Sequence, residues 1–134
     1  MEREIKFRAL SMCKGERWVY GNLRHYSRNP HTEKWTIYDP ATGLETDIDE
    51  TTIGQYTGLH DLNGKEIYEG DIVLVSDWTS VYASDYKGTV CFKRGQWVVS
   101  YEKYSCEMTP RLFFDDFSDL KTTIIGNIHE LPTK

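Results

Sequence analysis

The stretch of residues 54–73 constrains the fold more than any other part of the chain, because it places two glycine turns between apolar residues. Asn63-Gly64 is the dipeptide that best tolerates positive φ at both central positions of a type I′ turn, so a two-residue hairpin is predicted there. Gly70-Asp71 predicts a second turn, which leads into the apolar run of residues 72–75. This run is short and β-branched, which predicts a strand buried on both faces.

Runs of β-branched and aromatic residues on either side of this stretch predict further short strands. Downstream, residues 87–92 and 96–101 flank a glycine turn, and residues 123–129 supply one more strand in which Gly126 marks a bulge or a bend. Upstream, alternating residues predict two hairpins, one from residues 4–10 with 17–23 and one from residues 34–38 with 45–48.

One short helix is predicted over residues 111–120, because Pro110 is well placed for a first turn. Phe113, Phe117 and Leu120 recur at helical spacing, and we interpret their stripe as a plug for the core rather than a cofactor site. The expected fold is therefore mostly β: a small SH3-like barrel or pseudo-barrel with N-terminal β-hairpins and one short helix. Residues 51–134 form the predicted barrel core, and residues 1–50 form the hairpin region packed on it.

Composition predicts a cytoplasmic protein. No apolar run approaches the about 18 residues that a membrane span needs, and Met1-Glu2-Arg3-Glu4 lacks the hydrophobic region of a signal peptide. The three cysteines, Cys13, Cys91 and Cys106, fit no paired framework and no zinc spacing. We therefore expect a reducing compartment and no membrane association.

Charge is unevenly distributed along the chain. Residues 1–30 carry seven Lys or Arg against three Glu, a balance of +4, whereas the whole chain has a net charge of −5. Basic residues interleaved with aromatic ones suit a surface that contacts phosphates and stacks on the bases of a single strand. The alternative is a solvated hairpin face whose arginines pair with the acidic barrel, and we favour this alternative because a net acidic protein repels phosphates at long range. The candidate binding surface comprises Arg8, Arg17, Trp18, Tyr20, Arg24 and Arg28.

Catalytic, metal-binding and cofactor-binding residues are not predicted. The four histidines are scattered, no Ser-His-Asp or Cys-His spacing is visible, and the glycines mark turns rather than a phosphate-binding loop. Two acidic clusters, Asp47 with Asp49 and Glu50, and Asp115 with Asp116 and Asp119, offer oxygen ligands for a divalent ion. Such clusters are mostly solvated loops or helix starts, so we do not expect an enzyme.

Three stretches of the sequence form one distinctive combination: residues 5–9 with Tyr20-Gly21, the long central stretch of residues 54–73, and residues 124–130. In these stretches the chain resembles the YopX-like family of bacteriophage and prophage proteins. The resemblance implies a mostly β, barrel-like fold and a phage or prophage origin, and it brings no activity, cofactor or catalytic residue with it. One departure is Leu10, where the family's opening usually continues into a tryptophan.

Two functional hypotheses follow. The first is a non-enzymatic interaction module that binds a host or phage protein through its loops and β-sheet edges and that associates with copies of itself. The second is a nucleic-acid-binding accessory protein that uses the basic aromatic hairpins at its N-terminus. We favour the protein-interaction module.

Overall fold

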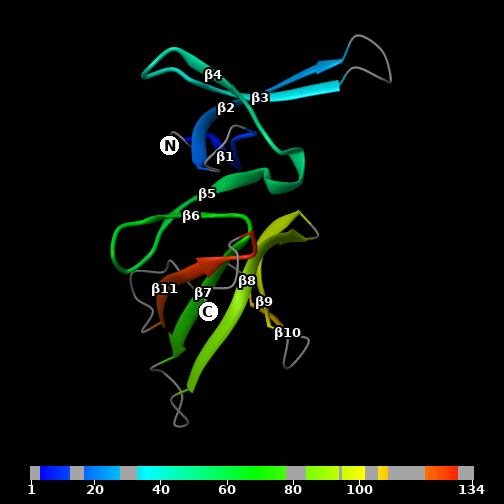
Figure 1. Cartoon of the computed structure of the whole chain (residues 1–134). Coiled ribbons are helices and arrows are strands. Elements are labelled where there is room, and N and C mark those ends of the chain that lie inside the picture. The colour runs from blue at the N-terminus through cyan, green and yellow to red at the C-terminus, as the bar shows by residue number, and fades with distance from the viewer. Residues whose placement is uncertain are drawn as a thin grey trace. The chain divides into compact units, whose positions relative to one another are not determined.

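The computed structural model describes residues 4–12, 17–27, 33–77, 84–93, 95–101, 106–108 and 120–129. The chain divides into two compact units, Met1–Tyr56 and Thr57–Lys134, which are described separately below. The boundary expected from the sequence lies slightly earlier, after residue 50. The described chain is mostly β, as predicted (Figure 1).

The N-terminal unit consists of antiparallel strands and one short helical turn. Neighbouring strands follow the order β4-β3-β2-β1-β5. The residues of β5 span the boundary between the units, and β6 is the next strand in the order after β5. The 3₁₀ turn η1 spans Glu50–Thr52, and the carboxylate of Asp49 caps it by accepting a hydrogen bond from the Thr51 amide. The strands of this unit are β1 (Phe7–Leu10), β2 (Trp18–Ser27), β3 (Glu33–Asp39), β4 (Leu44–Asp47) and β5 (Gly54–His60).

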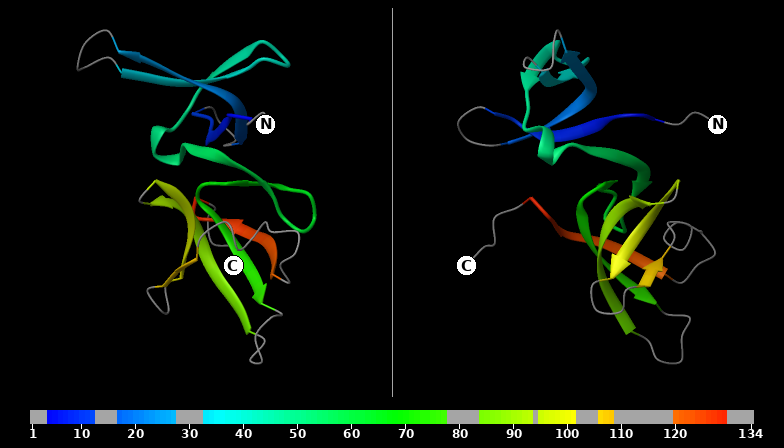
Figure 2. Two further views of the ribbon diagram at one scale, coloured as in Figure 1. Left: turned by 180° about the vertical axis from the view of Figure 1, so that it is seen from behind. Right: turned by 90° about the vertical axis from the view of Figure 1, so that its right-hand side faces the viewer.

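Both predicted N-terminal hairpins are present, and alternation along their strands builds the core. β2 pairs with β1 through residues 18–21 and with β3 through residues 22–27 (Figure 2). Gly21 lies where β2 changes partner, and a Cβ atom there would overlap the carbonyl oxygen of Tyr38, so the close approach requires glycine. The core comprises the buried residues Ala9, Ile37 and Ile48, with Phe7, Val19, Leu23, Trp35 and Ile53 packed against them.

The C-terminal unit holds a five-stranded antiparallel sheet with the order β10-β9-β8-β7-β11. The described strands leave β10 and β11 at opposite ends of this sheet, so they form an open sheet and not a closed barrel; of the two expected forms, only the pseudo-barrel is compatible with it. The strands of this unit are β6 (Glu66–Tyr68), β7 (Asp71–Asp77), β8 (Ser84–Lys93), β9 (Gln96–Tyr101), β10 (Cys106–Met108) and β11 (Leu120–Asn127). The core comprises Ile67, Val73, Val75, Val90 and Val99, with Trp97 and Ile124 packed against it.

Three details of this unit differ from expectation. Strand β7 is not buried on both faces: Val73 and Val75 are fully buried, whereas Ile72 and Leu74 on the other face are half-buried. The register of β11 against β7 shifts between Ile124 and Gly126, which places the bulge beside the glycine that predicted it. The helix expected over residues 111–120 lies outside the described residues except for Leu120, which begins β11.

The turn between β5 and β6 also differs from the predicted type I′ turn. The amide of Gly64 donates a hydrogen bond of 3.0 Å to the carbonyl oxygen of Asp61, so the residues inside the turn are Leu62 and Asn63. Gly64 follows them with a φ of +82°, which makes a three-residue loop with a left-handed glycine. The carboxylate of Asp61 explains this choice, because it accepts hydrogen bonds from the amides of Asn63 and Lys65, both at 2.9 Å.

Candidate functional site: a pocket in the N-terminal unit

The cationic and aromatic residues predicted to form a binding surface are partly brought together. Arg8 is directly opposite Tyr20 in the β1–β2 ladder, and alternation puts Trp18, Tyr20 and Arg24 of β2 on that same face. Arg17 is exposed and immediately precedes β2. Arg28 lies outside the described residues.

The two arginines of this face are engaged within the unit. Arg8 is only 6% exposed, and its guanidinium carbon lies 4.5 Å from the centre of the Trp18 ring. Arg24 lies 4.3 Å from the centre of the Tyr38 ring, and its Nη1 is 3.8 Å from Oε1 of Glu45. Phosphate contacts require guanidinium groups that reach solvent, so Arg8 is poorly placed to make them.

Glu45 organises the polar face of β2, β3 and β4. Its Oε1 accepts hydrogen bonds of 2.7 Å from the hydroxyls of Tyr26 and Thr36. The Tyr26 hydrogen bond, then that of Thr36, and then the charges of Arg24 and Lys34 hold the pKa of Glu45 below its ordinary value of 4.5. Arg24 thus has a carboxylate beside it that remains ionised.

The N-terminal unit also contains a pocket of about 400 Å³ beside the start of β3. Its volume falls in the range of about 300–1,000 Å³ that is common for ligand sites. Three separate segments form it: Met12, two residues after β1, the start of β3, and the chain from the end of β4 into η1. The lining residues are Met12, Glu33, Lys34, Trp35, Asp47, Ile48, Asp49, Glu50 and Thr51.

Main-chain pairing holds these three segments together. Ser11 forms an isolated antiparallel bridge with Ile48, and the amide of Met12 donates a hydrogen bond of 2.9 Å to the carbonyl oxygen of Asp47. The amide of Ile48 donates to the carbonyl oxygen of Trp35 at 3.2 Å. The pocket is therefore part of the hydrogen-bonded frame of the unit, although the residues that line it are far apart in the sequence.

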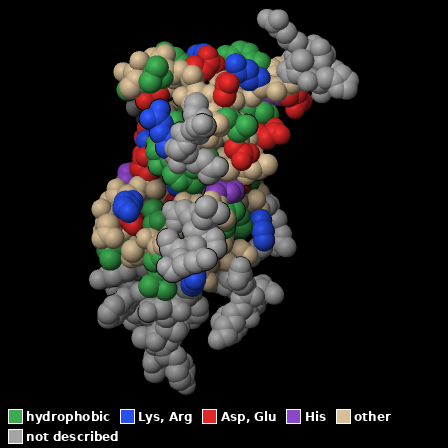
Figure 3. Space-filling view, in the orientation of Figure 1, with side chains coloured by type: hydrophobic (Ala, Val, Ile, Leu, Met, Phe, Trp, Pro, Cys, Tyr) green, Lys and Arg blue, Asp and Glu red, His purple; other side chains and the backbone are tan. Residues whose placement is uncertain are grey.

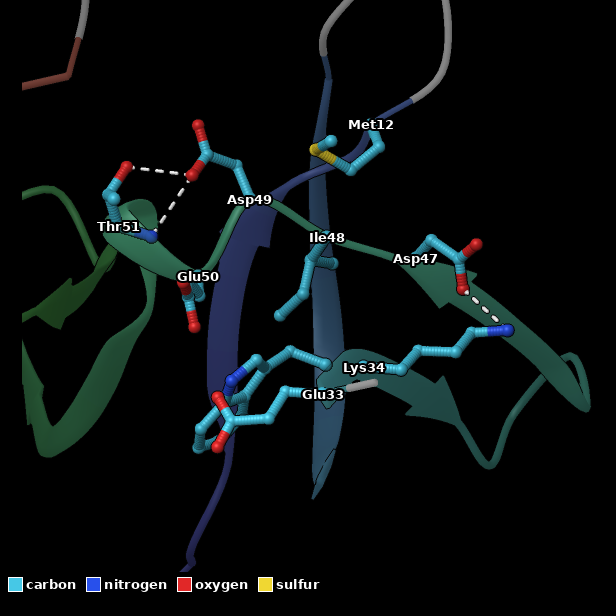
Figure 4. Close-up of a pocket in the computed structure, with 9 residues that line it drawn as sticks. Met12, Glu33, Lys34, Asp47, Ile48, Asp49, Glu50 and Thr51 are labelled. Carbon is cyan, nitrogen blue, oxygen red and sulfur yellow. Dashed lines mark hydrogen bonds and ion pairs between the residues drawn. The ribbon is translucent and has the colours of Figure 1, made fainter. Parts of the chain in front are cut away.

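Carboxylates outnumber the single ammonium group in the lining by four to one. Nζ of Lys34 lies 3.3 Å from Oδ1 of Asp47, and this ion pair lies on one side of Ile48, whereas Glu33 and Glu50 lie on the other side (Figure 4). In the space-filling view, Asp and Glu side chains lie among hydrophobic ones on the visible face of this unit (Figure 3). The pocket thus combines an apolar lining with an excess of negative charge.

Trp35 belongs to both the core and the pocket. The ring of His25 stacks on its ring at a centroid distance of 4.0 Å and an interplanar angle of 14°, and Nε2 of His25 is 3.9 Å from Oε1 of Glu33. Nε1 of Trp35 is buried and has no hydrogen-bond partner within the described part of the chain. A buried indole N–H without an acceptor costs about 1–3 kcal/mol.

The residues that the structure describes contain no group of three or more His, Cys, Asp or Glu side chains that is placed to hold a metal ion. The predicted cluster of Asp47, Asp49 and Glu50 does line the pocket, but Asp47 faces Lys34, and Oδ1 of Asp49 accepts hydrogen bonds from the amide and hydroxyl of Thr51. Within the described ranges there is also no helix that is long and apolar enough to span a membrane.

The glycine-rich central stretch has a different role, which is to support the C-terminal unit. Asp71 is 1% exposed, and its Oδ2 accepts a hydrogen bond of 2.8 Å from the amide of Tyr68. Gly70 has a φ of +93°, donates its amide to the carbonyl oxygen of Val90 and accepts from the amide of Ile128. Asn63, Gly64, Gly70 and Asp71 thus lie at the turns that join β5, β6 and β7.

A family model described as "YopX protein" matches residues 6–134, which is nearly the whole chain. The chain belongs to the YopX family. A search of curated proteins found no match. Among solved structures, this YopX family member is similar to protein EF1440 from Enterococcus faecalis, with 20% identity, a TM-score of 0.50, and coverage of 96% of this chain and 95% of that one. At this identity the likeness concerns the fold alone.

Sequence reasoning had considered only the acidic part of the pocket, and as a metal site. It missed Met12, Glu33, Lys34, Trp35, Ile48 and Thr51, which carry no motif; of these, Lys34, Trp35 and Ile48 belong to strands that were predicted for other reasons. Their one shared signal is the bridge between Ser11 and Ile48, a long-range pairing that local patterns do not reveal. The pocket of this YopX family member therefore depends on which residues pair between its strands.

Proposed function

We propose that this member of the YopX family is a non-enzymatic protein-interaction module, and that the pocket of its N-terminal unit holds a side chain of its partner. The observation that carries the proposal is the pocket itself, which joins an apolar lining to a rim of carboxylates. Apolar pockets with a polar rim are where the energetically dominant residues of protein interfaces insert. The proposed setting is the cytoplasm of a bacterial host, where host and phage proteins are both available as partners.

The surroundings of the pocket support a protein ligand. Met12 is 67% exposed at its rim, which leaves a large apolar side chain available for contact. Strand β4 ends the order of strands in its sheet, and Met12 occupies its outer edge at Asp47, so the part of that edge before Asp47 is available among the described strands for main-chain pairing. An extended segment of a partner that runs along such an edge makes main-chain hydrogen bonds while one of its side chains enters a pocket.

Affinity purification with three matched baits tests this proposal. The baits are the wild-type chain, Met12→Arg at the rim of the pocket, and Ile5→Arg, which introduces the same charge at a residue that is 60% exposed in the same unit and outside both the pocket and β4. Each is incubated with a lysate of the source cells, with and without nuclease treatment. We expect one protein to be captured by the wild type and by Ile5→Arg under both conditions and to be lost with Met12→Arg.

Two results contradict the proposal. If all three baits capture the same proteins, the pocket is not the interface. If capture by the wild type disappears on nuclease treatment, nucleic acid bridges the complex, and the basic aromatic face of β1 and β2 becomes the better candidate.

A further inference from the structure

We propose that Asn63 is a site of spontaneous deamidation that the closed loop between β5 and β6 protects, and that the product prevents this loop from closing again on β11. The inference is independent of the pocket. It rests on the Asn63-Gly64 dipeptide, on the hydrogen bonds that hold the main chain of this dipeptide, and on the attachment of the loop to β11.

The Asn63-Gly64 dipeptide contains the groups that this reaction needs. The main-chain nitrogen of Gly64 attacks the side-chain carbonyl carbon of Asn63, and the new N–C bond closes a succinimide ring. The C–N bond of the side-chain amide breaks, and its nitrogen leaves as ammonia with the proton of the attacking amide. Water then opens the ring at either carbonyl, which yields aspartate or isoaspartate. Glycine favours the attack because it has no Cβ to obstruct it.

The closed loop blocks the attack although the side chain of Asn63 is in water. Asn63 is exposed, so water reaches the carbonyl groups of a succinimide formed there. The amide of Gly64 donates a hydrogen bond to the carbonyl oxygen of Asp61 at 3.0 Å, and this bond must break before the nitrogen can attack. The amide of Asn63 is held as well, at 2.9 Å from Oδ1 of Asp61. The reaction therefore proceeds from an open form of the loop, and its rate follows the population of that form.

Opening of the loop requires its separation from β11, which lies beside it (Figure 1). Oδ2 of Asp61 accepts a hydrogen bond from the amide of Ile124 at 3.1 Å, and the amide of Leu62 donates to the carbonyl oxygen of Thr122 at 2.8 Å. Asp61 and Ile124 are 63 positions apart, so a strand that is distant in the sequence controls the chemistry of a local dipeptide.

Both products destabilise the closed loop. Each adds a carboxylate to the residue whose amide binds the carboxylate of Asp61, and like charges repel each other. Isoaspartate also routes the main chain through its side-chain carbon, which lengthens the chain by a methylene group between the two amides that face Asp61. The loop then remains open. The carbonyl oxygen of Thr122 and the amide of Ile124 are left at the outer edge of β11, where they can pair with another strand.

Peptide mapping by mass spectrometry tests the control of the reaction by the loop. The full chain and a synthetic peptide of residues 57–68 are incubated side by side in mildly alkaline buffer, and fragmentation assigns each deamidated residue. We expect deamidation of Asn63 in both, at least about tenfold more slowly in the full chain, because the peptide has no β11 to hold the loop closed. Equal rates in the two would overturn the inference.

Two variants of equal charge change test the contribution of β11 to this control. Asp61→Asn replaces one of the two acceptor oxygens with a nitrogen donor, so Asn63 should deamidate at least about fivefold faster than in the wild type, the factor for one lost hydrogen bond. Asp39→Asn, the same change in the N-terminal unit, should leave the rate unchanged. Equal rates in the two variants would contradict the role of β11. If Asp61→Asn does not fold, the comparison of the full chain with the peptide decides alone.

Asn63→Asp tests the effect of the product, because it introduces the carboxylate directly. Hydrogen exchange of the Ile124 amide, measured by nuclear magnetic resonance, should be about twofold to fivefold faster in Asn63→Asp than in the wild type. Asn63→Ser, which changes the same residue without adding a charge, should leave this exchange unchanged. An exchange rate at Ile124 that is the same in Asn63→Asp and in Asn63→Ser would show that the product does not hold the loop open.

Discussion

Oδ2 of Asp61 accepts a hydrogen bond of 3.1 Å from the backbone amide of Ile124, which lies 63 positions later in the chain. The other oxygen of the same carboxylate accepts from the amides of Asn63 and Lys65. One buried side chain thus shapes the turn between β5 and β6 and fixes it to β11 just before the bulge. An ionised carboxylate suits this position, because it offers acceptors on both oxygens to backbone donors.

Asp61→Ala should lower the free energy of unfolding by about 2–3 kcal/mol, because it leaves three backbone amides without their acceptor. Urea denaturation followed by tryptophan fluorescence measures the change. The matched control is Asp39→Ala, which removes one local hydrogen bond to the amide of Ala41 and should cost less than about 1 kcal/mol. Equal losses in the two variants would show that the link to Ile124 contributes nothing.

Gly21→Ala, inside β2, should destabilise the chain far more than Gly70→Ala, in the turn before β7. At Gly70 the positive φ costs about 1 kcal/mol, while an added Cβ meets only ordinary contacts at 3.6 Å or more. At Gly21 the added Cβ overlaps the carbonyl oxygen of Tyr38, so β2 and β3 must separate. Thermal unfolding of both variants provides the comparison, and a smaller loss for Gly21→Ala would contradict the described close approach.

Glu45 should contribute stability that depends on pH. The hydrogen bond from Tyr26 and the other contacts lower the pKa of Glu45 in the folded chain. The stability that Glu45 contributes is therefore fully present above the pKa of the unfolded chain, and it is lost as the pH falls through the pKa of the folded chain. The difference in free energy of unfolding between the wild type and Glu45→Gln should therefore be largest near neutral pH and should disappear at acidic pH. A carbon-detected titration of Glu45 should also show its midpoint moving upward in Tyr26→Phe.

Single-stranded DNA and RNA should not bind measurably at low salt, where electrostatic affinity is greatest. The physical reason is that Arg8 is covered by Trp18 and Arg24 lies beside Glu45. A titration of labelled oligonucleotides checks this expectation. Binding that falls steeply with added salt, with a smaller slope in Arg17→Ala, would restore the nucleic-acid alternative.

Local patterns were sufficient for most strands of this fold. Gly95 and Gly43 lie in hairpin turns, and the alternating or β-branched runs beside them became β8 with β9 and β3 with β4. The type of the turn after β5 was not predictable in the same way, because the Asp61 carboxylate selects it and that carboxylate is held by a distant strand. Likewise, the apolar residues at helical spacing predicted that Leu120 ends a helix. In the structure Leu120 begins β11 and pairs with Asp77 of β7, a long-range pairing that local spacing does not reveal.

The pocket was less accessible to prediction than the strands. Its acidic residues were visible as a cluster in the sequence, but their relation to Trp35 and Met12 depends on which residues face each other across β3, β4 and the end of β1. A shift of one residue in any of these pairings would turn the side chains to the other face. Charge and aromatic content therefore drew attention to β1 and β2, where Arg8 and Arg24 are internally engaged, instead of to the pocket.

The pairing of β11 with β7 sets an order in which the chain can be completed during synthesis. The N-terminal unit has all its strands once Gln55 is available to pair with Phe7. The C-terminal sheet, in contrast, must wait for Asn127 to reach Asp71, so β7 leaves the ribosome long before its second neighbour exists. During that interval one edge of β7 is open to other nascent chains. Slowing translation after residue 101 should therefore increase aggregation of this protein more than slowing it before residue 56.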